Sequence, residues 1–65
     1  MKILILKLRT DKNITLEKLA NASGISKSTL QRMETGAVSP TMDKMEKLAE
    51  AMGVKITDLF ESEYK

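Results

Sequence analysis

The stretch TLEKLANASGISKSTLQRMET, residues 15–35, decides the fold. It contains two short segments of helical character separated at Gly24, a residue that can adopt the positive φ of a tight turn between helices. Ala20 is small at a point where two helices must cross closely. The apolar contacts that fix the angle between the helices would come from Leu19, Ile25, Leu30 and Met33. The stretch therefore predicts two helices joined by a tight turn.

The second of these helices, predicted over residues 26–34, has one apolar and one polar face. At about 100° per residue, Leu30 and Met33 point toward the core. The polar side chains fill an arc of roughly 140°. They are Lys27, Ser28, Gln31 and Arg32. Such an arc is either an ordinary solvated face or a surface that reads base edges, because Arg can bind guanine through a fork and Gln can pair with adenine. The adjoining helix and turn favour the second alternative.

Length and composition exclude several classes of protein. A chain of 65 residues forms a single domain, residues 1–65. It has no Cys and no His, which excludes disulfides, thiolate zinc sites and His-based acid–base catalysis. We therefore expect no enzyme, no metal and no cofactor. The opening MKILILKLR is too short to span a membrane and has no cleavage site, which favours a cytoplasmic protein.

Charge is unevenly distributed along the chain, although the formal net charge is only +2. Residues 1–33 carry seven basic and two acidic side chains, whereas residues 34–65 carry four basic and seven acidic ones. A basic first half is a weak indication of a polyanionic partner.

The rest of the chain is also predicted to be helical, which gives an all-α, compact five-helix bundle. Amphipathic helices are expected over residues 15–22 and 41–52, with Thr15 and Thr41 as N-caps and Gly53 ending the second. Ser26 caps the helix over residues 26–34. Residues 3–8 have the composition of a buried strand, but a lone strand would have no partner, so a first helix is predicted there.

The core is expected to draw on the last helix and on the methionines. A helix over residues 56–63 would carry Leu59 and Phe60 inward. The methionines at helical spacing are expected to fill the core rather than to form a flexible binding surface. They are Met33, Met42, Met45 and Met52.

Four consecutive stretches of the chain resemble one family. LKLRTDKNITLEKLA, SGISKSTLQRMETG, SPTMDKMEKLAEAMGV and ITDLF occur in the order and at the spacings of the Cro and repressor type of helix-turn-helix, the Xre-like family of phage and bacterial transcription regulators. The resemblance covers nearly the whole chain, from about Ile5 to Phe60. It implies a lambda-repressor-like DNA-binding domain, usually dimeric, that binds double-stranded operator DNA and often represses transcription.

The resemblance also implies roles for individual residues. It places Lys27, Ser28 and Arg32 at base edges, and the polar arc adds Gln31. Phosphate contacts are implied at Thr15, Ser26 and Thr29, and a helix starting near Thr41 can present backbone amides to a phosphate. Arg9 and Glu34 stand where the family often has a structural ion pair that holds the first helix against the reading helix.

Two departures from the family pattern bear on affinity. Many relatives begin the second helix with Gln, where this chain has Leu16. Relatives also often carry Lys or Arg just after the Gly that ends the reading helix, where this chain has Ala37 and Val38. Fewer basic side chains release fewer counterions, so we expect a shallow salt dependence and modest non-specific affinity.

A homodimer is expected, and two surfaces compete for its interface. The first is the last segment, with Ile56, Leu59, Phe60 and Tyr64. The second is the excess of apolar residues in the first helix, which are Ile3, Leu4 and Leu6.

Other functions remain open at this stage. An antitoxin or a controller protein of a restriction system would have the same sequence pattern. A protein-interaction adaptor that has lost DNA binding is the other alternative, and Leu16, Ala37 and Val38 support it. No domain for a small-molecule ligand is expected.

Overall fold

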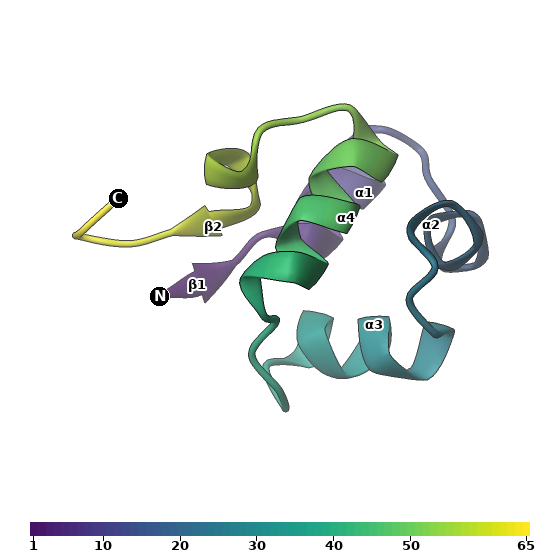
Figure 1. Cartoon of the computed structure of the whole chain (residues 1–65), viewed down its shortest axis with the longest axis horizontal. Coiled ribbons are helices and arrows are strands. Elements are labelled where there is room, and N and C mark those ends of the chain that lie inside the picture. The colour runs from purple at the N-terminus through teal and green to yellow at the C-terminus, as the bar shows by residue number, and fades with distance from the viewer.

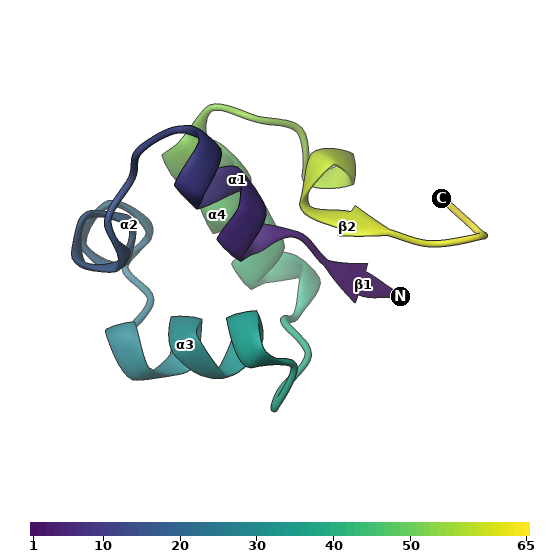
Figure 2. The same cartoon turned by 180° about the vertical axis from the view of Figure 1, so that it is seen from behind.

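A computed structural model describes all residues from 1 to 65. Four α-helices follow one another as α1 (Ile5–Asp11), α2 (Leu16–Ser23), α3 (Lys27–Thr35) and α4 (Met42–Met52). They are flanked by two short strands, β1 (Lys2–Ile3) and β2 (Phe60–Glu61), and a 3-10 helix, η1 (Ile56–Leu59), precedes β2. Helix α3 lies along one edge of the molecule, and the two termini lie together at one end (Figures 1 and 2).

The boundaries of α2, α3 and α4 follow from their caps. The Thr15 and Thr41 hydroxyls accept hydrogen bonds from the backbone amides of Lys18 and Lys44, at 3.1 and 3.2 Å. Each of the three helices ends at a glycine in the left-handed region, and Gly24 has φ of 74°. A side chain at that φ would be strained, so Gly24 permits the tight turn between α2 and α3. The helix-turn-helix over residues 15–35 is therefore present.

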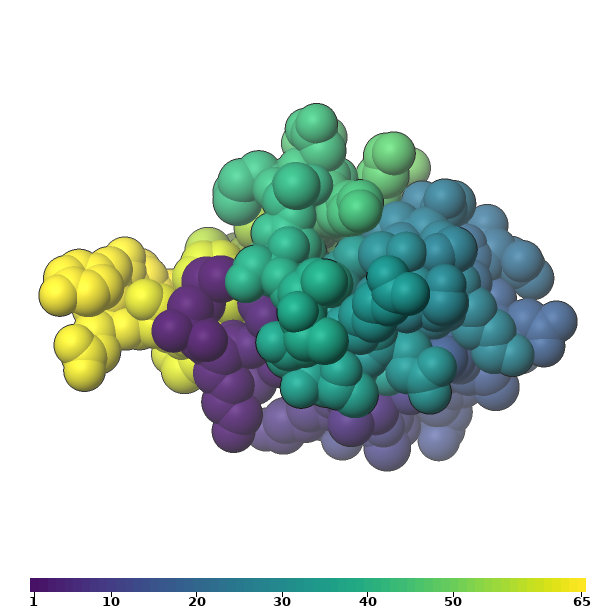
Figure 3. Space-filling model, turned by 90° about the horizontal axis from the view of Figure 1, so that it is seen from below, coloured from purple at the N-terminus to yellow at the C-terminus, as the bar shows by residue number.

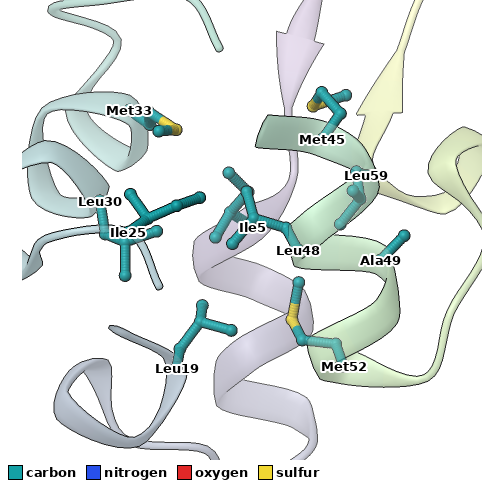
Figure 4. Packing of buried hydrophobic residues seen from close by; sticks show 10 residues of the cluster. All are labelled: Ile5, Leu19, Ile25, Leu30, Met33, Met45, Leu48, Ala49, Met52 and Leu59. Carbon is teal, nitrogen blue, oxygen red and sulfur yellow. The ribbon is translucent and has the colours of Figure 1, made fainter. Parts of the chain in front are cut away.

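The core lies where the helices converge. Ile5 of α1 faces Leu48 of α4, and α3 contributes Leu30 and Met33 from the side (Figure 4). Helix α2 packs against both α3 and α4. The cluster of ten buried residues consists of Ile5, Leu19, Ile25, Leu30, Met33, Met45, Leu48, Ala49, Met52 and Leu59. This one cluster fixes the angle at which α3 leaves the body of the domain.

The prediction of five helices is wrong because residues 56–59 form a 3-10 helix, whereas the predicted first helix is present but begins only at Ile5. Residues 2–3 form a strand, and the partner that the sequence did not reveal is β2, with Lys2 opposite Glu61 and Ile3 opposite Phe60. The predicted helix over residues 56–63 ends at Leu59, because the chain becomes extended at Phe60 (φ −148°, ψ 160°). The pairing joins segments almost a whole chain apart, and no local pattern indicates such a contact.

One predicted core residue is also wrong. Met42 is 67% exposed, because it is the first residue of α4 and lies outside the stripe that faces the core. Met33, Met45 and Met52 are buried as expected. No helix has the length and the apolar character needed to cross a membrane.

Candidate nucleic-acid interface

Helix α3 presents an uncovered polar face. Seen from below, α3 (teal) faces the viewer and no other element lies over it (Figure 3). Leu30 and Met33 are at most 1% exposed on its inner side. The structure leaves all four side chains of the predicted arc exposed on the same helix, namely Lys27, Ser28, Gln31 and Arg32. The burial pattern of α3 therefore matches the predicted division into a buried apolar face and an exposed polar face.

A small hydroxyl network forms the N-terminus of α3. The Ser26 hydroxyl accepts a hydrogen bond from the Thr29 backbone amide at 3.2 Å and donates one to the Thr29 hydroxyl at 2.7 Å. Because a hydroxyl has a single proton, this bond leaves the Thr29 proton free for an outside acceptor. Ser26 is therefore the helix cap that the sequence predicts. Its bond to the Thr29 hydroxyl, which the sequence did not indicate, also orients Thr29.

The ion pair between Arg9 and Glu34 is present and fixes the other end of α3. The Nε and Nη2 atoms of Arg9 donate to the two carboxylate oxygens of Glu34 at 2.8 and 3.3 Å. The Nη1 atom donates to the Ile14 carbonyl at 3.2 Å. The two side chains are 17% and 7% exposed. One guanidinium therefore joins α1, the connection from α1 to α2, and the last turn of α3.

This ion pair also determines the charge of the exposed face. The Glu34 carboxylate is held inward by Arg9, so it contributes little negative charge outside the domain. Lys27 and Arg32 project from α3 without an ion-pair partner. A second short helix, α2, starts beside α3, and its first-turn amides have no partner within the helix. The same holds at the start of α4, next to Thr41.

The residues predicted for a subunit interface have different exposures. Leu59 is fully buried in its own chain, so it supports the surface from inside and cannot form part of it. Ile56 and Phe60 are half-buried, whereas Tyr64 is 94% exposed. On the competing surface Leu6 is 48% exposed.

The cap of α3 makes a direct prediction about stability. We expect Ser26→Ala to lower the free energy of unfolding by about 1 kcal/mol, because the Thr29 amide loses its acceptor. Ser26→Asp should retain the value of the original chain, since a carboxylate also caps a helix. Urea unfolding measures both changes. Ser39→Ala is the control at an exposed serine whose hydroxyl makes no hydrogen bond within the chain, and an equal loss there would contradict a specific capping role.

A polar helix left uncovered and braced across a tight turn by a second helix defines a helix-turn-helix domain. The chain belongs to the helix-turn-helix family, whose pattern matches residues 5–59.

Relatives and solved structures agree with this membership. The chain is 38% identical over 52 residues to the cryptic phage CTXphi transcriptional repressor RstR of Vibrio cholerae, and this match covers 80% of the chain but only 47% of RstR. It is 40% identical over 48 residues to an uncharacterized helix-turn-helix-type transcriptional regulator of Methanocaldococcus jannaschii, covering 74% of the chain and 73% of that protein.

Two solved structures have the same fold. The restriction-modification controller protein C.AhdI of Aeromonas hydrophila superposes with a TM-score of 0.82 and 32% identity over 86% of this chain and 85% of that one. The N-terminal DNA-binding domain of SinR from Bacillus subtilis superposes with a TM-score of 0.80 and 26% identity over 94% and 90%.

Proposed function

We propose that the chain is a sequence-specific DNA-binding regulator of transcription that inserts α3 into the major groove. The observation that carries this proposal is the uncovered face of α3, where Lys27, Gln31 and Arg32 are exposed together. A helix of this width fits the major groove, and these side chains match the donors and acceptors of guanine and adenine edges. The relatives named as a repressor and a transcriptional regulator support a role in transcription, most simply as a repressor.

The backbone of the DNA would be held by the ends of the helices. Thr29 can donate its free hydroxyl proton to a phosphate, because the Ser26 hydroxyl donates its own proton to the Thr29 oxygen and holds it in place. Thr15 and Thr41 stand at the starts of α2 and α4, where unpaired amides and the helix dipole favour an anion. These contacts position α3 without selecting a sequence.

Selection of bound sequences from random double-stranded DNA tests this function. We expect an enriched palindrome whose half-sites are centred about one helical turn, or 34 Å, apart, because two copies would bind symmetrically. If the selection enriches no sequence at moderate salt, the result instead favours an adaptor that binds protein. The similarity to C.AhdI supports a controller of a restriction system as a second candidate. In that case the selected sequence should occur upstream of a restriction gene.

The dimer that this symmetry needs would form through the last segment of the chain. Phe60 is half-buried and Tyr64 almost fully exposed at the end of the molecule where the termini meet (Figure 1). We expect Tyr64→Glu to shift the protein toward the monomer in sedimentation experiments, because a charge would replace apolar contact area. Leu6→Glu is the matched variant on the competing surface. If only Leu6→Glu dissociates the dimer, α1 forms the interface.

A further inference from the structure

A groove separates β1 from the connection between α3 and α4. It encloses about 520 Å³, with residues 1–3 on one side and residues 33–36, Val38 and Ser39 on the other. In the space-filling view, residues 1–3 (purple) lie directly beside this connection and next to α3 (Figure 3). The groove therefore opens at the C-terminal end of α3, on the side of the molecule where α3 is exposed.

Lys2 gives this groove a positive charge. Glu34 lies in the opposite wall, but its carboxylate is bound by Arg9 and only 7% of its side chain is exposed. Glu61 stands opposite Lys2 in the strand pair, yet its carboxylate lies 3.9 Å from Lys65 Nζ, and Lys2 itself makes no ion pair. Lys2 is therefore the only basic side chain in the lining of the groove, and it makes no ion pair.

The strand pair fixes the position of this lysine. Ile3 pairs with Phe60 and packs against the core cluster, and the Leu4 amide donates to the Leu59 carbonyl at 2.8 Å. Lys2 is consequently attached to a segment with a defined place, rather than to a free end. The chain has no basic residue immediately after Gly36, where Ala37 and Val38 stand. Lys2 brings a cation to that end of α3 from the N-terminal strand β1.

We propose that this groove receives a backbone phosphate of the DNA bound by α3, and that Lys2 is the side chain that pairs with it. The inference rests on the proposed function, because it requires α3 in the major groove. The major groove of DNA is about 12 Å wide, so a sugar–phosphate backbone must pass close to each side of an inserted helix. The last three residues of α3 line the groove of the protein, so one of these backbones would pass beside it, and the Ser39 hydroxyl in its wall adds a second donor.

Salt-dependent binding to the selected operator and to unrelated DNA tests the role of Lys2. We expect Lys2→Gln to weaken binding to both DNAs equally, by about 5- to 10-fold at ~0.1 M salt, and to reduce the slope of log K against log salt by about 0.9. Lys2→Arg should retain both values. The matched control is Lys55→Gln, since Lys55 is exposed and directly precedes η1. The connection between α4 and η1 lies on the side of the molecule opposite α3 (Figure 1).

The outcomes separate this inference from the proposed function. If Lys2→Gln retains the original affinity and slope while Arg32→Ala loses discrimination, the groove does not bind phosphate but the function stands. If the original chain selects no DNA, the function itself is wrong. A loss of affinity that sedimentation traces to a dissociated dimer would assign the groove to the subunit interface and overturn the inference. Thermal denaturation of each variant establishes that it is folded under the binding conditions.

Discussion

Replacing Arg9 by methionine is expected to lower the free energy of unfolding by about 3 kcal/mol. Methionine retains most of the apolar stem, so the loss comes from the charge and its hydrogen bonds. Removal of the guanidinium leaves the Glu34 carboxylate, at 7% exposure, without its partner and leaves the Ile14 carbonyl without a donor. A domain of this length has a total stability of roughly 3–10 kcal/mol, so this loss is a large fraction of the whole.

A double-mutant cycle isolates the ion pair from other effects of the substitution. Glu34→Gln should cost less than Arg9→Met, because a glutamine oxygen still accepts from the guanidinium and no unpaired carboxylate remains. In the double variant the two losses should be clearly less than additive. Strictly additive losses, measured by urea unfolding, would show that the pair contributes nothing beyond its two separate side chains.

The central helices of this fold can be predicted from the sequence because their signals are local. Thr15, Ser26 and Thr41 each cap a helix through an amide three residues away, and Gly24 ends α2 after eight residues. Such contacts lie within a few residues of one another, so the sequence pattern contains them almost completely. The polar face of α3 follows from the same local period.

The two ends of the chain could not be predicted, because the contacts that shape them join residues far apart in the sequence. Ile3 adopts a strand because Phe60 pairs with it from the far end of the sequence, and two residues are too few to give an alternating pattern. The sequence predicts Leu59 both in the core and at the subunit interface, and only the packed structure shows that it is fully buried in its own chain. Residue type therefore identifies the apolar positions without distinguishing the core from a surface.

The candidate site combines both kinds of contact. The reading face of α3 is a local feature, whereas the position of Lys2 beside it depends on the strand pair. The contacts of Arg9 were predictable in part. The resemblance to a family indicated its partner Glu34 but not its third hydrogen bond, to the Ile14 carbonyl. The structure therefore adds most to the prediction from the sequence at surfaces that are assembled from distant segments.

Arg32→Ala is expected to weaken binding to the selected operator by about 10- to 100-fold, corresponding to the 1–3 kcal/mol of one bidentate base contact. Arg32 lies in the exposed arc of α3, and neither Glu34 nor any other carboxylate engages it. Its guanidinium can therefore present two donors to guanine. The loss should be concentrated at one base pair of each half-site, where the preference for a particular base should disappear.

Arg32→Lys separates the geometry of this contact from its charge. Lysine retains the positive charge but not the planar fork, so we expect binding to unrelated DNA to persist while discrimination at that base pair falls. Competition binding with operators altered one base pair at a time measures both quantities. If both variants discriminate as well as the original chain, Arg32 does not read a base, and the reading face must lie nearer Lys27 and Ser28. If Arg32→Ala weakens all DNAs equally, Arg32 contacts a phosphate instead.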